Sequence, residues 1–487
     1  MNVRTVAVEM LSLGLMIGFA VAVSTHVLPL GVPGEWEWSR LHDPVWTSPA
    51  QGLLLGLLGS VVLALYAGFV FWGFRDLSRA ETSKGGRALW VSALAVASVL
   101  TQIGLQSAAP EGFGLTKWTF SLHSSGSNGY YTLARSDAMS DPARFVRQYP
   151  GWIKKQDSLH VGTHPPGLFL IWRGVLGFWQ SHPQAAQVVS RLLPEPIQAG
   201  FREISEFDPL PSADRAALAS VGFLTLLACS LTVIPLYFLA RDCLSPALSW
   251  AAAALWPVVP SAILFQPTAD TAFPLLATSA LALAISGKRI GPFVCGLVLA
   301  LAMQLTLAFL AVGLVVAILH LTRANIPWLR RLERVGWTGL GFLALSGLFW
   351  GVSGANPLTI WLANAHNHAR FYEQFPRSYL AWNLANPIEL AVALGLPAFV
   401  WAVVGFRRAG WSVWAPVLVL ALLQVSGRNL SEVARLWLPL MPPLLISAAA
   451  GWSRFGARVG AVAVSVLLVG AQTLWLQATI QVVYALG

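Results

Sequence analysis

Long apolar runs alternate with short polar segments along almost the whole chain. A run of about 20 mostly apolar residues can cross a bilayer as one helix. By this criterion the pattern predicts about thirteen transmembrane helices. The expected spans lie at 5–30, 52–73, 88–107, 215–240, 247–265 and 271–286, twice within 290–321, at 335–353, and four times after residue 387.

Two long polar segments interrupt this pattern, at 108–214 and 354–387. Within the first, residues 168–180 are apolar but too few to span comfortably, so we expect an interfacial or re-entrant helix there. The sequence thus predicts an all-α polytopic membrane protein with a large outer loop that contains interfacial helices. We divide it into two N-terminal transmembrane helices (1–87), a transmembrane core that carries the long loop (88–350), and C-terminal transmembrane helices with the second loop (351–487).

The distribution of Lys and Arg predicts which face each loop occupies. Segments 75–87 and 323–334 are rich in Arg, and cytoplasmic loops of membrane proteins carry such an excess. Counting spans from these loops places both long polar segments and Asp270 on the opposite, outer face. We therefore expect an integral protein of a bacterial cytoplasmic membrane with its active site outside.

Composition supports the membrane class. Hydrophobic residues make up 56% of the 487 residues and charged residues only 11%, against about 25% in soluble domains. The net charge of +10 is explained by the basic loops, so we expect no nucleic-acid partner. The three cysteines have no metal-ligand spacing and predict no disulfide framework.

The most distinctive polar motif is the turn from His160 to Gly167, which precedes the apolar run at 168–180. Proline suits the first turn of a helix but not its interior, so the histidines stand just before a helix start. Free backbone N–H groups at such a start can hold an anion. We assign His160 and His164 to a phosphate and Thr163 to the substrate. The alternatives are ordinary interfacial residues or a metal-binding pair.

Three aspartates are candidates for carboxylate chemistry. Asp270 follows Pro267 at the start of an apolar run. It either caps a helix, or orients an acceptor or a divalent metal ion, Mg²⁺ or Mn²⁺. Asp137 and Asp141 lie near several arginines in the long loop. They either belong to a charged surface helix or include a general base.

Several cations gather in the second polar segment and just beyond it: His366, His368, Arg370, Arg377 and Arg435. Arginine recognises phosphate well, so we assign the three arginines to a phosphate and the two histidines to the substrate. The alternative is a solvated loop that faces lipid headgroups. Arg435 stands three residues from Glu432 and either pairs with it or faces a cavity.

The order of these motifs resembles the GT-C superfamily of integral-membrane glycosyltransferases, in particular the branch of the protein mannosyltransferases and aminoarabinose transferases. The resemblance covers about residues 88–350. It rests on a long outer loop with the segment Tyr130–Arg135, the turn His164-Pro165-Pro166, a span that ends at Arg241, and Asp270 at a helix start.

This resemblance implies transfer of a sugar from a polyprenyl-phosphate donor to a lipid, glycan or protein acceptor outside the cytoplasm. It implies that His164 and the loop cations hold the donor phosphate and that Asp270 lies at the acceptor or at a metal. Tyr130 and Tyr131 would contact the substrate.

The chain departs from the family in one place. Acidic residues usually precede the tyrosine segment, where this chain has Gly126-Ser127-Asn128-Gly129. Asp137, Asp141, Glu111 or a carboxylate from the two N-terminal spans would then have to supply the base, or the protein is a divergent or inactive member.

Two other functions fit the composition. A lipid-linked-sugar flippase or transporter would carry ionisable residues in the middle of its spans, whereas this chain concentrates them near the outer rim. A non-catalytic protein of the same fold would bind a lipid or a protein partner, and the missing acidic residues favour that alternative. A carboxylate that shares a cavity with His164 and Asp270 would favour the enzyme.

Overall fold

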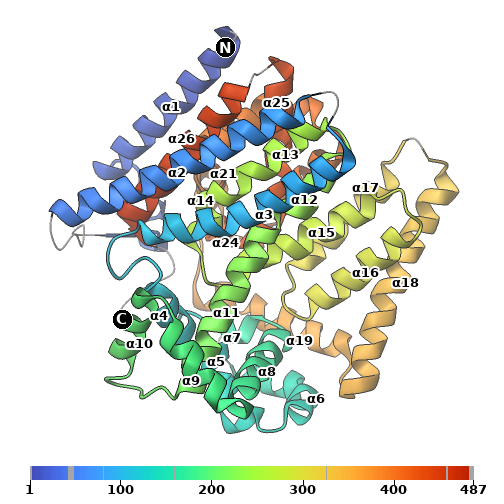
Figure 1. The fold of residues 1–487 in the computed structure, drawn as a ribbon. Coiled ribbons are helices and arrows are strands. Elements are labelled where there is room, and N and C mark those ends of the chain that lie inside the picture. Colours follow the sequence, from blue (N-terminus) through green and yellow to red (C-terminus); the bar gives the residue numbers. More distant parts are fainter. Residues whose placement is uncertain are drawn as a thin grey trace.

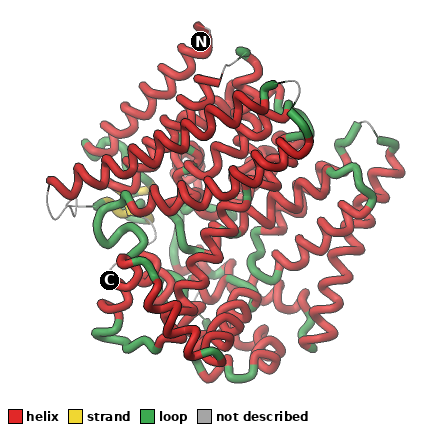
Figure 2. The backbone as a smooth tube through the Cα atoms, in the orientation of Figure 1, coloured by secondary structure: helices red, strands yellow, loops and turns green. Residues whose placement is uncertain are grey.

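The computed structural model describes residues 3–41, 49–79, 82–156, 159–324, 326–456 and 459–481. Within these ranges nearly every element is a helix, and the only strands are four two-residue pieces (Figure 2). The predicted all-α class is therefore confirmed for this part of the chain.

Six helices in the described ranges are long and apolar enough to cross a membrane, or seven if a bent pair counts as one span. They support the prediction of an integral membrane protein. The six are α1 (Val3–Ser24), α2 (Pro49–Leu77), α3 (Lys84–Ser107), α11 (Ser212–Leu231) with its continuation α12 (Val233–Ala240), α18 (Trp328–Ser353) and α26 (Val459–Thr479). The bent pair is α21 (Tyr379–Leu394) and α22 (Leu396–Gly405), whose axes turn by 103°.

The expected count of about thirteen full spans is not confirmed, because several apolar runs form short or broken helices. At 1.5 Å per residue, helices of 13 to 16 residues reach only about 20–24 Å, against about 30 Å of hydrocarbon. These are α15 (Phe273–Ile285), α16 (Ile290–Met303), α17 (Phe309–Leu321) and α23 (Trp411–Ser426). The run at 247–265 breaks at prolines into α13 (Pro246–Leu255) and α14 (Pro260–Leu264), and α25 (Pro442–Arg454) is also short.

The long polar segment folds into a cluster of short helices at one end of the bundle, opposite the N-terminus (Figure 1). They are α4 (Lys117–His123), α5 (Tyr130–Arg135), α6 (Pro142–Trp152), α7 (His160–Thr163), α8 (Gly167–Ser181), α9 (Pro183–Leu192) and α10 (Glu195–Ile204). α8 corresponds to the helix expected at 168–180. The second polar segment forms α19 (Pro357–Ala369) and α20 (Phe371–Gln374), and α24 (Val433–Leu436) precedes α25.

Short 3-10 helices join these elements: η1 (Asp137–Met139), η2 (Ile153–Lys155), η3 (Trp256–Val258), η4 (Ala269–Thr271), η5 (Phe406–Arg408) and η6 (Leu438–Leu440). The strands β1 (Gly31–Val32) and β2 (Trp36–Glu37) form a small antiparallel hairpin. β3 (Ser39–Arg40) pairs antiparallel with β4 (Ile480–Gln481) and so links segments near the two ends of the chain.

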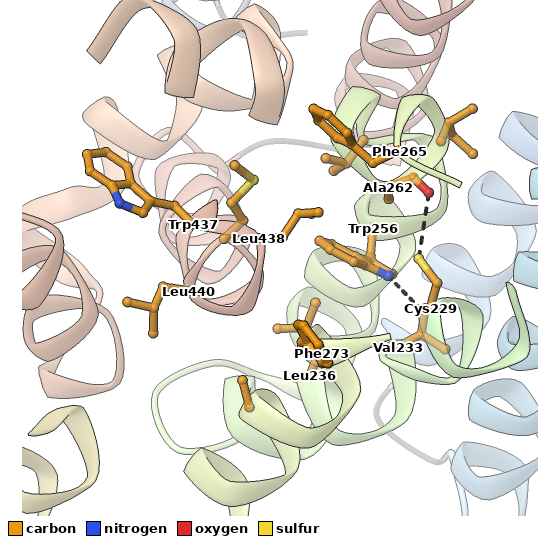
Figure 3. Packing of buried hydrophobic residues seen from close by; sticks show 14 of the residues in the cluster. Cys229, Val233, Leu236, Trp256, Ala262, Phe265, Phe273, Trp437, Leu438 and Leu440 are labelled. Carbon is orange, nitrogen blue, oxygen red and sulfur yellow. Dashed lines mark hydrogen bonds between the residues drawn. The ribbon is translucent and has the colours of Figure 1, made fainter. Parts of the chain in front are cut away.

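The packed centre of the bundle holds the segment that carries Asp270. Figure 3 shows Trp256 beside Cys229, to whose carbonyl its Nε1 donates at 2.7 Å. Phe265 and Phe273, at the two ends of the Asp270 segment, are both buried in this core. α15 also packs against η6, which follows α24 directly. The core therefore fixes Asp270 and α24 relative to each other.

Candidate active site

Asp270 and Arg435 meet although they are far apart in the sequence. Asp270 lies in η4, and its Oδ2 is 3.6 Å from Nη1 of Arg435. Arg435 also forms an ion pair with Glu432 on the same turn. Burial lowers the pKa of Arg435, but the charges of Glu432 and Asp270 outweigh it and the pKa is raised. The pair of Arg435 with Glu432 is thus present. Asp270 pairs with the same cation, while the N-cap position of η4 belongs to Thr268.

The backbone that presents Arg435 is unusual. Ser431 and Glu432 have φ values of 80° and 55°, in the left-handed region that non-glycine residues seldom occupy. Such conformations cost about 1–3 kcal/mol and persist only where surrounding contacts impose them. One contact is Glu389, whose carboxylate accepts a hydrogen bond of 3.0 Å from the Ala434 N–H.

Tyr130 lies near this ion pair, and His164 lies beside Tyr130. The two rings have centroids 5.8 Å apart. Burial raises the pKa of the Tyr130 phenol, Asp270 raises it further, and Arg435 acts in the opposite direction. Gly129 precedes Tyr130 with φ of 71°, and a Cβ there would lie 2.3 Å from Val161. The backbone conformation and the close approach of Val161 therefore favour glycine at the start of α5.

His368 faces His164 from the second polar segment. Burial lowers the pKa of His368, and the neighbouring charges of His164 and Arg428 lower it further. Two buried amides hold α19 against the His164 turn. Asn364 Nδ2 donates to the Tyr149 hydroxyl at 2.8 Å, and Asn367 Nδ2 donates to the Gly162 carbonyl at 2.6 Å. The Tyr149 hydroxyl in turn donates to the His164 carbonyl.

The turn that carries His164 ends at Gly167, which packs tightly on the segment after α16. The Gly167 N–H donates to the Gln304 carbonyl at 2.9 Å. A Cβ at Gly167 would lie only 2.4 Å from that oxygen. Glycine at this position thus lets α8 begin directly against Gln304.

Two other candidate cations, Arg370 and Arg377, already form hydrogen bonds within the protein. Arg370 Nη1 donates to Asn367 Oδ1 at 3.0 Å, and Arg377 Nη1 donates to the Glu35 carbonyl at 3.0 Å. His366 is exposed on α19. Thr163 Oγ1 is 3.3 Å from Nδ1 of His164. The side chain of His160 lies outside the described part of the structure.

Asp137 and Asp141 lie at the surface and not in this group. Asp141 Oδ1 caps α6 by accepting the Arg144 N–H at 2.9 Å, and Asp137 is exposed in η1. Glu111 accepts a hydrogen bond of 3.0 Å from Gln51. Across the described ranges, no hydrogen bond or ion pair joins these three carboxylates to Asp270 or Arg435. Among the described residues, Asp270 and Glu432 form ion pairs with Arg435, and Glu389 lies at the neighbouring Ala434 N–H.

Tyr131 points away from Tyr130 into a second polar network that the sequence did not reveal. Its hydroxyl donates to Asp214 Oδ1 at 2.6 Å. Arg135 lies 3.4 Å from Asp214 and 2.9 Å from Asp208, and His123 lies 2.8 Å from Asp208. Hydrogen bonding from His123, and then from Arg135, lowers the pKa of Asp208. The network holds α5 on α4 and α11, with Tyr130 on the side of Asp270.

The described residues include no group of three or more His, Cys, Asp or Glu side chains that could hold a metal ion. Asp270 is paired with Arg435 instead. The geometry here therefore does not fit a bound Mg²⁺ or Mn²⁺, and we derive no step through a metal.

An apolar cavity of about 230 Å³ lies beside Asp270. It is lined by residues of α8, α11 and the Asp270 segment, among them Leu168, Leu224, Pro267, Ala269 and Ala272. Leu224 is also exposed on α11, a helix long enough to span a membrane. A hydrocarbon chain in this cavity would lie next to Asp270.

No family model matches the chain, and no curated protein matches it. Among solved structures, it is similar to the Archaeoglobus fulgidus oligosaccharyltransferase complex with Zn and sulfate, at 13% sequence identity and a TM-score of 0.39. The match covers 78% of this chain and 53% of that one, so the chain spans about half the length of that protein. A likeness of this size does not establish a common fold or a common activity.

Proposed function

We propose that the protein is a membrane glycosyltransferase of the GT-C type. It would move a sugar from a polyprenyl-phosphate donor to an acceptor on the non-cytoplasmic face, with inversion at the sugar carbon. The observation that carries this proposal is the convergence of Tyr130, His164, His368, Asp270 and Arg435 from separate segments of the chain. Cations, a carboxylate and an apolar cavity then lie together, as a charged lipid substrate requires.

The cations would bind the donor phosphate. Burial and then the charge of His164 lower the pKa of His368, and a phosphate beside the two rings would offset that effect. Arg435 is held in place by two carboxylates. A cation fixed before the reaction stabilises charge that develops on the departing phosphate.

Asp270 would be the general base. The acceptor oxygen attacks the anomeric carbon, the bond from that carbon to the phosphate oxygen breaks, and the phosphate leaves with the electron pair. The proton of the acceptor hydroxyl goes to Asp270, whose 3.6 Å ion pair with Arg435 loosens as the phosphate engages Arg435. Asp270 would thus take the role that the missing acidic motif leaves open.

The transporter alternative is less well supported. Glu9 is buried in α1, but it accepts hydrogen bonds from Trp401 at 3.1 Å and Ser465 at 2.8 Å. These bonds join α1 to α22 and α26, so Glu9 has a structural role. Tyr130, His164 and His368 instead come from the two long polar segments of the chain.

The test measures donor binding and sugar release with purified protein and a panel of labelled polyprenyl-phosphate sugars. His164→Ala should weaken donor binding, whereas Asp270→Asn should keep binding and lose transfer. Glu195→Gln is the control, because Glu195 pairs only with the exposed Arg202 among the described residues. Binding without turnover by the wild type would instead favour a non-catalytic lipid-binding protein.

A further inference from the structure

A second apolar cavity, of about 460 Å³, lies on the other side of the start of α8. Residues of α6, α8, α16 and α18 line it, among them Val146, Leu170, Leu301 and Leu348. Figure 1 shows α6 near the end of α18 that is close to the α4–α10 cluster. The two cavities thus flank α8, with Leu168 lining the first and Leu170 the second.

This second cavity opens toward the bilayer. Leu348 and Val352 line it from α18, and they are 61% and 80% exposed. α18 is long and apolar enough to span, so these side chains would face lipid. An occupant with a hydrocarbon chain can enter from that side without crossing water.

The edge of the cavity is cationic. Arg144 and Arg147 are exposed on α6, next to the lining residues Ala143 and Val146. Neither guanidinium has an ion-pair partner among the residues that the structure describes. Exposed arginines beside a lipid-facing cavity attract an anionic headgroup.

The same cavity reaches the candidate active site by two routes. On α6, Val146 lines the cavity and Tyr149, about 5 Å further along the helix axis, donates to the His164 carbonyl. At the inner end, Gln304 lines the cavity and its carbonyl accepts the Gly167 N–H. The buried Gln304 Oε1 has no hydrogen-bond partner in the described ranges and could accept one from an occupant.

We propose that the acceptor is an anionic membrane lipid whose hydrocarbon chain occupies this second cavity, while the donor's polyprenyl chain occupies the first. This inference rests on the proposed glycosyltransferase function. With both chains anchored beside α8, the acceptor headgroup would lie at the α6 arginines, on the helix whose Tyr149 donates to the His164 carbonyl. A soluble glycan or a protein acceptor has no hydrocarbon chain to fill a lipid-facing apolar cavity.

The first experiment uses photoactivatable phosphatidylglycerol, with the reactive group in an acyl chain, and protein in phosphatidylcholine nanodiscs. We expect the wild type to be labelled in α6, α8, α16 or α18. Ala143→Trp and Val352→Trp fill the cavity from two exposed positions and should each reduce labelling about tenfold. Ala185→Trp on α9 and Leu343→Trp on α18 are exposed matched controls and should label like the wild type.

Headgroup charge is tested with the same probe. Replacing Arg144 and Arg147 by Gln should weaken labelling about fivefold for each arginine removed, whereas Arg191→Gln on α9 should not. A phosphatidylcholine probe with the same chains should label weakly in every variant. Equal labelling by both probes, or equal labelling of Ala143→Trp and the wild type, would overturn the proposal.

The second experiment follows the labelled sugar in a mixed envelope extract. The label should enter the organic phase, and Ala143→Trp should reduce that transfer while donor binding is kept. If the label enters protein or soluble glycan and Ala143→Trp has no effect, the lipid acceptor is wrong although the glycosyltransferase function stands. If no donor is bound or turned over at all, the proposed function fails and the lipid acceptor fails with it.

Discussion

Gly167 offers a direct test of how the His164 turn is built. In an exposed helix interior, replacing Gly by Ala stabilises the folded protein by about 0.5–1 kcal/mol, because it reduces the conformational entropy of the unfolded chain. At Gly167 the new Cβ would lie 2.4 Å from the Gln304 carbonyl oxygen and 2.9 Å from its carbon. Both are backbone atoms, so α8 would have to move away from the segment after α16.

The expected cost follows from two effects. Overpacking a tight contact costs about 1–3 kcal/mol, and the hydrogen bond from the Gly167 N–H to Gln304 contributes about 0.5–1.5 kcal/mol if it is lost. We therefore expect Gly167→Ala to destabilise the protein by about 0.5–4 kcal/mol, since these costs exceed the gain in helix propensity. Because the turn carries His164, donor binding should weaken as well.

Gly174 supplies the matched control in the same helix. A Cβ there meets nothing within 4 Å, so Gly174→Ala should be neutral or stabilising by about 0.5–1 kcal/mol. Thermal unfolding of the purified protein, followed by tryptophan fluorescence, would compare the two variants with the wild type. If Gly167→Ala is as stable as Gly174→Ala, the close contact between α8 and Gln304 does not exist and the account of the turn is wrong.

Three further predictions concern the groups around the site. Asp270→Asn should reduce sugar transfer by about 10²–10⁴-fold with little change in donor affinity, and a parallel loss of binding would argue against the base role. Binding of a donor phosphodiester should strengthen as the pH falls toward the acidic range, because burial lowers the pKa of His368 in the free protein and a bound anion favours its protonated form. His368→Asn should flatten this profile in a titration of Kd against pH. Tyr131→Phe should lower the free energy of unfolding by about 1–3 kcal/mol, as it removes the buried hydrogen bond to Asp214. The control is Tyr379→Phe at an exposed position, which should lower the free energy of unfolding less. Equal losses of stability by the two variants in a thermal unfolding assay would contradict the role of the Tyr131 network.

The membrane class was predictable because it depends only on composition and on the length of apolar runs. The number of full spans was not, because hydropathy does not show where an apolar run turns. Pro257 and Pro260 split one expected span into two short helices. The two helices expected within 290–321 are present, but each is too short to cross alone.

The candidate site was partly predictable. His164 and Asp270 stand out as polar residues at helix starts, and Arg435 as a cation in an apolar context. The residues that hold them in place did not stand out, because side chains such as Asn364 and Asn367 act through contacts with segments about two hundred residues away in the sequence. Neighbouring tyrosines at 130 and 131 also look equivalent in the sequence, although they face different networks in the fold.

The central claim is that Asp270 and the cations around it transfer a sugar from a lipid phosphate. The most direct measurement incubates the purified protein with a labelled polyprenyl-phosphate sugar and an envelope extract, beside Asp270→Asn and the control Glu195→Gln. The account predicts that the label moves to a new product with the wild type and Glu195→Gln, and not with Asp270→Asn. Equal transfer by Asp270→Asn, or release of no sugar from any donor by the wild type, would contradict it.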